Sequence, residues 1–248
     1  MMTQNEILEQ EDFLANKSAE EILSLLSEQL GKDIVFASSL GAEDQVIFDM
    51  ISRLGLDIPV FTLDTGRLFQ ETYDLIDATE KKYNKKIKVF FPKHEAVEEM
   101  IAEDGVNSFY KSAELRKNCC HVRKLEPLSR ALKPYNAWIC GLRRDQAETR
   151  SGVKVLELDG NGRIKINPLI NWTEEDVWNY INKYDLPYNK LHDKGFLSIG
   201  CAPCTRAVVP GEHVRSGRWW WETPEQKECG LHVVDGKIVR KNKDNNNE

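Results

Sequence analysis

Short β-rich runs alternate with amphipathic helical stretches through the first part of this chain. The β-rich runs are residues 33–37, 58–63, 87–91 and 137–140, and the helical patterns between them cover 43–54, 67–83, 94–103 and 122–132. This alternation predicts an α/β fold with right-handed crossovers and a mostly parallel, twisted sheet that has helices on both faces. Because ligands of such folds bind beyond the carboxyl ends of the strands, the loops that follow the strands are where we expect a functional site.

Capping motifs predict two more helices. Ser18 and Glu21 form a capping box that opens a helix ending at Leu30. Thr173 precedes three acidic residues and apolar residues at helical spacing, which is typical of a capped core helix. After Pro187 the periodicity fades into a stretch rich in Gly and Pro, where loop-borne chemistry could lie.

The charge balance excludes several classes of partner. The 248 residues include 34 Lys and Arg against 40 Asp and Glu, which gives a formal net charge of -6. Affinity for nucleic acid backbones comes from clustered cations, so we expect no nucleic acid partner and only a local anion site. No run approaches the ~20 apolar residues of a membrane span, and the N-terminus lacks the pattern of an export signal. We therefore expect a cytoplasmic chain with no membrane partner.

Three predicted strands end in loops whose residues suit a nucleotide. A Ser/Gly loop before a helix offers backbone N–H groups and hydroxyls to a phosphate or sulfate, although a plain helix cap is as good an interpretation. An Asp/Gly loop could also be a simple turn, and arginines could be solvated surface residues. The candidates are Ser38, Ser39 and Gly41 after the first strand, Leu63, Asp64, Thr65 and Gly66 after the second, and Gly141, Arg143 and Arg144 after the fourth.

Two cysteine pairs form the most specific signal in the sequence. Cys119 and Cys120 are adjacent, and Cys201 and Cys204 form a Cys-x-x-Cys pair. Without an export signal, metal binding or redox chemistry is a better interpretation than disulfides. Four thiolates suit either tetrahedral zinc or a 4Fe-4S cluster, and the tandem pair favours the cluster because Cys-x-x-Cys pairs dominate structural zinc sites.

Two further cysteines stand apart from these pairs. Cys140 lies within an apolar strand pattern and is expected to be a small core residue. Cys229 lies near the C-terminus between Lys227 and His232, both of which could favour its thiolate. It is either an accessible nucleophile or an incidental surface thiol.

Ordered motifs connect these features into one pattern. They are residues 38–44, 63–67, 119–124, 141–144, 172–178, 201–204, 214–222 and 228–232. With them the chain, over residues 34–232, resembles the assimilatory sulfonucleotide reductases, and specifically the cluster-containing adenylyl-sulfate reductases. The resemblance implies the adenine nucleotide alpha-hydrolase-like (PP-loop) fold.

The resemblance also implies a role for each candidate residue. The three strand-end loops would hold the adenylyl sulfate, and a single 4Fe-4S cluster would be bound by the two cysteine pairs. In this assignment Cys119, Cys120, Cys201 and Cys204 ligate the cluster, Cys229 is the nucleophile, and Lys124, Arg215, Arg218 and His232 close around the sulfate and phosphate.

The implied activity is the thioredoxin-dependent reduction of adenosine 5'-phosphosulfate (APS) to sulfite and AMP, in sulfate assimilation and cysteine biosynthesis. The Cys229 thiolate would attack the sulfuryl group and expel AMP, while nearby cations stabilise the transition state. An external dithiol, expected to be that of thioredoxin, would then release sulfite from the S-sulfocysteine. The cluster would position Lys124 and tune the local field rather than deliver electrons.

This resemblance implies a division of the chain into three parts. We expect residues 1–204 to form an α/β nucleotide-binding domain that carries the iron–sulfur site. Residues 205–234 would be a mobile, loop-rich segment that brings Cys229 first to the substrate and then to the reductant. Residues 235–248 are too polar to bury a core and are expected to be a disordered tail.

Alternatives remain at this point. The substrate could be 3'-phosphoadenosine 5'-phosphosulfate (PAPS), or both nucleotides. An ATP-pyrophosphatase of the same general fold is another alternative, although its Ser-Gly-Gly-x-Asp-Ser type loop differs from residues 39–44 here. The last is a zinc-binding structural or regulatory module. A homo-oligomer is possible, since periodicity does not show an interface.

Overall fold

A six-stranded sheet forms the centre of the computed structural model, which describes residues 4–146 and 152–223. The strand order is β3-β2-β1-β4-β6-β5, and all neighbouring strands are parallel except β5 and β6. The strands are β1 (Ile34–Ala37), β2 (Val60–Leu63), β3 (Lys88–Phe90), β4 (Ala137–Ile139), β5 (Leu156–Leu158) and β6 (Ile164–Ile166). The predicted mostly parallel sheet and its first four strands are confirmed.

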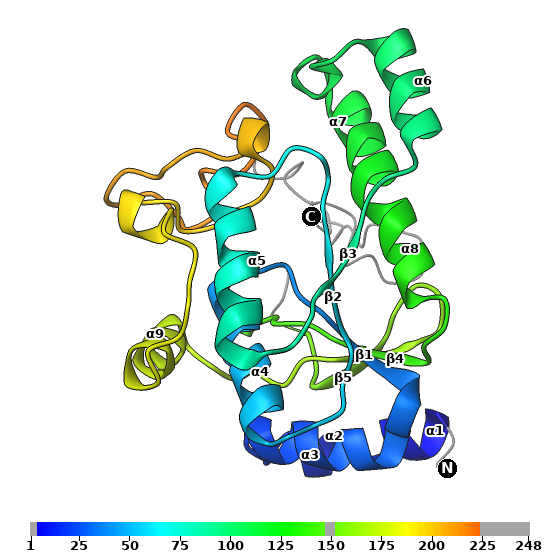
Figure 1. Ribbon diagram of the computed structural model, residues 1–248, viewed down its shortest axis with the longest axis vertical. Coiled ribbons are helices and arrows are strands. Elements are labelled where there is room, and N and C mark those ends of the chain that lie inside the picture. Colours follow the sequence, from blue (N-terminus) through cyan, green and yellow to red (C-terminus); the bar gives the residue numbers. More distant parts are fainter. Residues whose placement is uncertain (1–3, 147–151, 224–248) are drawn as a thin grey trace, which may run out of the picture.

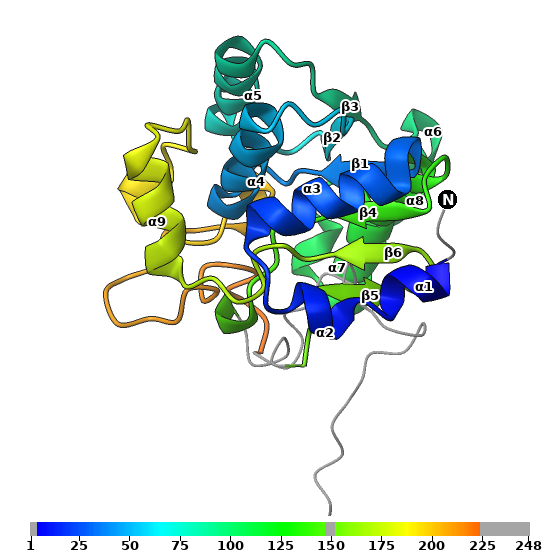
Figure 2. The ribbon, with the colours of Figure 1, turned by 90° about the horizontal axis from the view of Figure 1, so that it is seen from below.

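Helices cover both faces of this sheet (Figures 1 and 2). The helices are α1 (Gln4–Leu8), α2 (Glu11–Leu14), α3 (Ala19–Leu30), α4 (Ala42–Arg53), α5 (Gln70–Tyr83), α6 (His94–Asp104), α7 (Ala113–Cys120), α8 (Glu126–Leu132) and α9 (Glu174–Lys183). The capping boxes at Ser18 and Thr173 are both present. Helix α4 contacts α3 and α9, whereas α8 contacts β2 and β3 from the other face.

The helix predicted over residues 122–132 has a different form in the structure. A π-helical turn, His121–Leu125, joins α7 to α8 directly after the tandem cysteines. Such turns often occur at functional sites. The turn buries Arg123, which donates to the Thr65 carbonyl at 2.7 Å and so connects the cysteine helix to the loop after β2.

The order of the strands explains where a ligand can bind. From β1 the chain moves outward through β2 to β3, and it then returns to place β4 on the other side of β1. The strand order therefore reverses between β1 and β4, and in doubly wound folds the ligand crevice opens at that point. The loops that carry Ser39 and Gly141 follow these two strands.

Two apolar clusters stabilise the described residues. The large one is formed by the sheet and by α3, α4 and α9, and it includes strands β1, β4 and β6, which are buried on both faces. The small one joins Phe109 and Trp219 to Cys204, with the other paired cysteines packed against them. The cysteine region is therefore packed as a unit of its own.

Beyond α9 the described chain is mostly irregular. A 3-10 turn, Ala202–Cys204, and an isolated antiparallel bridge between Thr205 and Arg218 interrupt it. Nucleophile candidate Cys229, His232 and the predicted tail lie outside the described residues, and the division into domains stays a prediction. Among the described helices, none is long and apolar enough to span a membrane.

Candidate functional site

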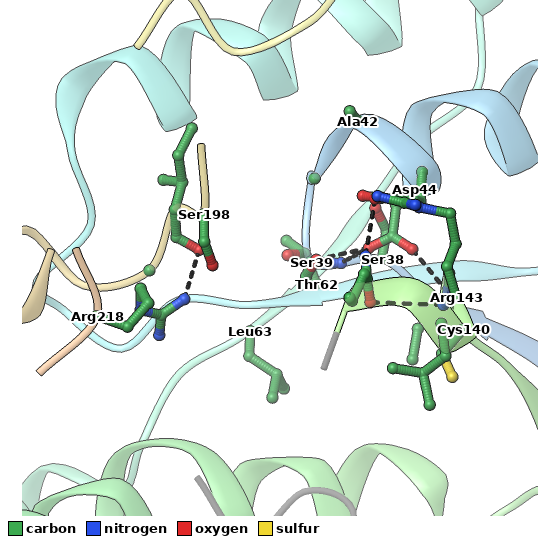
Figure 3. Close-up of a pocket in the computed structure, with 18 of the residues that line it drawn as sticks. Ser38, Ser39, Ala42, Asp44, Thr62, Leu63, Cys140, Arg143, Ser198 and Arg218 are labelled. Atoms are coloured by element: carbon green, nitrogen blue, oxygen red, sulfur yellow. Dashed lines mark hydrogen bonds and ion pairs between the residues drawn. The ribbon is translucent and has the colours of Figure 1, made fainter. Parts of the chain in front are cut away.

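A cavity of about 290 Å³ opens at the carboxyl ends of β1, β2 and β4, where the strand order reverses. Figure 3 shows Arg218 at one end of it and Asp44, Arg143 and Cys140 at the other, with Leu63 between them. The residues predicted to contact the substrate that line this cavity are Ser38, Ser39, Gly41, Leu63, Thr65, Lys124, Gly141, Arg143, Arg215 and Arg218.

Of the residues predicted in the strand-end loops, three do not line the cavity. Asp64 is buried and accepts from the Gly66 backbone N–H at 2.7 Å and from the Tyr73 hydroxyl at 3.0 Å, so it builds the turn after β2. Gly66 has a φ of 72°, which favours glycine at this turn. Arg144 is exposed and donates to the Val153 carbonyl at 3.0 Å, away from the cavity.

The sequence predicts that the Ser/Gly loop after β1 offers free donors to an anion. In the structure the Ser39 donors of this loop are already occupied. Asp44, in the first turn of α4, accepts from the Ser39 backbone N–H at 2.5 Å and from the Ser39 hydroxyl at 2.6 Å. It also accepts from the Gly141 backbone N–H at 3.0 Å. Burial raises the pKa of Asp44 to about 6 despite these hydrogen bonds. A carboxylate of the chain itself thus lies where such a loop would hold an anion.

Gly141 allows this close approach of α4 to the loop after β4. A Cβ atom at this position would collide with the Asp44 carboxylate and would lie 2.8 Å from the Cβ of Glu43. Glycine is therefore required here for packing, and the same packing brings the loops after β1 and β4 together across the cavity.

Arg143 is buried and already paired with carboxylates. Its Nε donates to Glu43 at 2.8 Å, and its Nη1 donates to Asp145. Gln146 donates to the same Glu43 oxygen at 2.7 Å. The cation at this end of the cavity is therefore neutralised by the chain.

The four paired cysteines lie around one small cavity of about 20 Å³. Cys119 and Cys120 end helix α7, while Cys201 and Cys204 flank the 3-10 turn. Cations surround them, and the arginines and lysine that line this cavity are Arg67, Arg116, Arg123, Lys124 and Arg218. Burial, together with the three neighbouring thiols, raises the pKa of Cys204 to about 12.

The donor set fits an anionic four-thiolate cluster. Within the described residues, no three His, Cys, Asp or Glu side chains are arranged to hold a single metal ion. The four thiols nonetheless face one space, with cations that would balance the charge of thiolates, and they match the ligand set of a 4Fe-4S group. The residues present therefore suit such a cluster in type and number.

The two cavities share part of their lining. Lys124, Cys201, Arg218 and Trp219 line both of them. The Lys124 side chain forms no hydrogen bond or ion pair with the part of the chain that the structure describes. Arg218 is almost fully buried, stacks on Trp219 at 4.9 Å and donates to the Ile199 carbonyl at 2.9 Å. Cationic side chains thus stand between the cysteines and the larger cavity.

A buried ion pair that the sequence analysis missed fastens the irregular segment to α7. Arg116 donates to both carboxylate oxygens of Glu222, at 2.9 and 2.7 Å, and both side chains are almost inaccessible to solvent. The guanidinium also stacks on Trp219 at 4.6 Å. No local pattern could have found this pair, because its members lie 106 residues apart.

His192 and Cys140 also line the larger cavity, although neither was a predicted site residue. His192 packs edge to face on Trp178 at 5.2 Å, and burial lowers its pKa, which keeps the ring neutral at pH 7. Cys140 is buried as expected for a core residue, and its thiol donates to Asn167 at 3.1 Å. It has a polar partner as well as a place in the cavity wall.

Comparisons with known proteins agree with this geometry. The model of the phosphoadenosine phosphosulfate reductase domain matches residues 33–207. An adenosine 5'-phosphosulfate reductase from Burkholderia cepacia is 49% identical over 86% of this chain and 87% of its own length. One from Allochromatium vinosum is 51% identical over 87% of this chain and 84% of its own length.

Solved structures give the same result. A phosphoadenylyl-sulfate (PAPS) reductase from Candida auris, solved as a phosphate complex, superposes with a TM-score of 0.71. It is 30% identical, and the match covers 84% of this chain and 98% of that one. An FMN adenylyltransferase from Candida glabrata shares the fold alone, with 18% identity and a TM-score of 0.54 over 86% of this chain and 70% of its own. From the domain match and the extent of identity, the chain belongs to the sulfonucleotide reductase family, which the PAPS reductase domain defines.

Proposed function

We propose that this chain reduces APS to sulfite and AMP with electrons from thioredoxin, as an enzyme of sulfate assimilation. Its relatives named adenosine 5'-phosphosulfate reductase support the substrate and the reaction. The observation that carries the proposal is the shared wall of the two cavities, where Lys124 and Arg218 face both the cysteines and the nucleotide site.

Different parts of the cavity would bind the charged and the uncharged parts of the substrate. The phosphate and sulfuryl groups of APS would lie against Lys124, Arg215 and Arg218, which line the cavity and would balance the negative charge of these groups. The nucleoside would extend toward the loops after β1 and β4. Leu63 and Thr65 line the wall between these ends and would contact the nucleoside.

The first chemical step uses Cys229 as nucleophile. Its thiolate forms a bond to the sulfuryl sulfur, the bond from sulfur to the phosphate oxygen breaks, and AMP leaves with the electron pair. Lys124, Arg215 and Arg218 stabilise the charge that moves onto the leaving phosphate, a role that the resemblance also implies for His232. Glu222, which the ion pair with Arg116 holds on α7, is seven residues before Cys229 (229 − 222). A fully extended segment of seven residues spans about 25 Å, which is the greatest distance that Cys229 could lie from Glu222.

The second step consumes the S-sulfocysteine. A thioredoxin thiolate attacks the Cys229 sulfur, a mixed disulfide forms, and sulfite leaves with the electron pair of the broken sulfur–sulfur bond. The second thioredoxin thiol then resolves the mixed disulfide, which regenerates the Cys229 thiol. The dithiol thereby supplies both electrons of the reduction.

A 4Fe-4S cluster would be held by Cys119, Cys120, Cys201 and Cys204. When bound, it supplies a fixed, polarisable charge beside the shared wall of the two cavities. The residues of the chain carry the reaction itself: Lys124 and Arg218 bind and orient the anion, and Trp219 excludes water between them.

A direct test measures the products and the intermediate. Anaerobically purified protein with thioredoxin should release sulfite and AMP from APS, and without reductant it should gain the mass of one sulfo group on the peptide that contains Cys229. Absence of both products with APS, in protein that contains iron and sulfide, would contradict the proposal. Iron-free protein that holds one zinc would instead favour the structural zinc module.

Lys124 should contribute mainly to the chemical step. We expect Lys124→Ala to slow S-sulfocysteine formation about 10²-fold, because it removes one preorganised cation from the transition state. Rapid mixing with APS and mass spectrometry would measure this rate. The visible absorption of the cluster should persist, and Lys117→Ala, which changes an exposed lysine on α7 that lines neither cavity, should leave the rate as it is. An unchanged rate in Lys124→Ala would refute the role.

A further inference from the structure

Residues 218–222 are attached to both cysteine pairs. The Trp219 backbone N–H donates to the Cys204 carbonyl at 3.1 Å, which fastens the segment to the Cys-x-x-Cys turn. Three residues later, the Glu222 carboxylate is held by Arg116, which lies on α7 one helical turn before the tandem cysteines. We call residues 218–222 the strap, because they reach from one cysteine pair to the other.

Arg116 is shared between the strap and the tandem cysteines. Its guanidinium donates to both Glu222 carboxylate oxygens, at 2.9 and 2.7 Å, and it also hydrogen-bonds the Cys120 thiol. Arg116 is inaccessible to solvent, and only 4% of the Glu222 side chain is exposed. Water cannot take the place of either partner in such a site, so the end of the strap keeps its position only while this contact is intact.

The backbone at Trp219 has a conformation that depends on its surroundings. Its φ of 40° lies in the left-handed region, which residues with large side chains rarely adopt. The indole is buried, and the guanidinium groups of Arg116 and Arg218 stack on it at 4.6 and 4.9 Å. A disfavoured backbone conformation persists only where neighbouring contacts impose it. The shape of the strap is therefore set by the residues around the cysteines.

The beginning of the strap packs closely on the loop that carries the Cys-x-x-Cys pair. A Cβ atom at Gly200 would collide with the Arg218 guanidinium, and one at Gly217 would collide with the Arg206 carbonyl. Arg218 also donates to the Ile199 carbonyl at 2.9 Å. The strap is thus fixed to the Cys-x-x-Cys loop at its beginning and to α7 at its end.

We propose that the strap positions Cys229 for attack, that Arg116 and Glu222 are its positioning residues, and that it keeps its place only while one group joins the two cysteine pairs. Four thiolates that bind one group fix the distance between the pairs, and with it the distance between the two attachments of the strap. Glu222 is seven residues before Cys229, so a shift of Glu222 moves the point from which the chain leads to the nucleophile. This inference rests on the proposed function, because it takes Cys229 as the nucleophile.

Hydrogen exchange tests the attachment of the strap without turnover. The comparison is between the holoprotein and protein from which iron has been removed by anaerobic chelation. Peptides that cover residues 216–222 should exchange at least about tenfold faster without iron, because the strap has lost its fixed support. Peptides from β4, which is buried in the sheet, should keep their protection in both samples and so exclude general unfolding.

Glu222→Gln tests the positioning role in protein that keeps its cluster. This variant removes the charge that binds Arg116, so sulfo transfer to Cys229 at saturating APS should slow at least about tenfold through loss of orientation. The visible absorption of the cluster and the affinity for AMP should stay at the wild-type values. A general loss of structure would lower both of these, whereas loss of position lowers only the transfer rate.

Arg116→Lys provides a second variant and Glu212→Gln a matched control. Lysine keeps the positive charge but cannot donate to both Glu222 oxygens in the fixed geometry of arginine, so an intermediate transfer rate is expected, even if Glu222→Gln does not fold. Glu212 also accepts two hydrogen bonds from an arginine, Arg206, but it is partly exposed and lines neither cavity. Glu212→Gln should leave both the exchange of the strap and the transfer rate as they are.

The outcomes distinguish this inference from the proposed function. A wild-type transfer rate in both Glu222→Gln and Arg116→Lys overturns the positioning role and leaves APS reduction standing. Equal exchange of the strap with and without iron overturns its dependence on the joined cysteine pairs. If the iron-free protein also loses protection in β4, the strap has no separate dependence on the cluster and that part of the inference fails. Absence of a sulfo group on wild-type Cys229 refutes the proposed function itself.

Discussion

Cys229→Ser is expected to abolish sulfite release from APS, with a loss on the order of 10⁴-fold or more. Serine keeps the shape of the side chain but is not ionised near neutral pH, so no thiolate is available to attack the sulfuryl sulfur. The measurement is sulfite release with thioredoxin, together with mass spectrometry of the protein after incubation with APS. The variant should gain no sulfo group at position 229.

Two comparisons make this result specific to the nucleophile. Cys229→Ser should keep both the visible absorption of the cluster and its affinity for AMP, because the cysteines that face the small cavity and the residues that line the larger one are unchanged. Cys204→Ser should instead lose the absorption. A sulfo group found on another cysteine of Cys229→Ser would show that the reaction uses a different nucleophile.

The architecture was predictable because its signals are local. Each of the first four strands is a short apolar run between helical patterns, and the parallel arrangement follows from that alternation. The hairpin of β5 and β6 was missed although it carries a signal, since Asn161-Gly162 lies between two alternating segments. Its strands are only three residues long, which is too short for the alternation of apolar and polar residues to be recognised.

The candidate site was predictable only in part, because contacts distant in sequence decide which donors are free. The sequence favours Ser39 as an anion-binding residue, but in the structure its backbone N–H donates to Asp44. The Gly141 backbone N–H donates to the same carboxylate from a position 97 residues away in the sequence. The cysteine pairs gave a stronger prediction, since four thiolates suit only a few kinds of site, such as tetrahedral zinc or a 4Fe-4S cluster. Their convergence on one cavity is what the spacing predicted.

The buried pair of Arg116 and Glu222 is expected to govern the stability of the segment that precedes Cys229. Replacing Arg116 with methionine leaves the Glu222 carboxylate without its two charged hydrogen bonds in a site almost closed to solvent. Breaking such a pair from one side costs about 3–5 kcal/mol. Urea unfolding should show a clearly lower midpoint for Arg116→Met, with a further loss of activity because Trp219 stacks on this guanidinium.

A double variant and a matched pair separate charge burial from simple loss of contacts. Arg116→Met with Glu222→Gln should recover part of the lost stability, because the unpaired charge is gone while the glutamine still fills the site. Arg206 and Glu212 form a pair of similar geometry in the same segment, but both side chains are partly exposed. Arg206→Met should therefore lower the unfolding midpoint far less, since water can solvate the carboxylate it leaves. If Arg116→Met and Arg206→Met lower the unfolding midpoint equally, burial does not determine the free-energy cost of breaking the pair. Residues 205–223 would then be held on α7 by their aromatic contacts rather than by this ion pair.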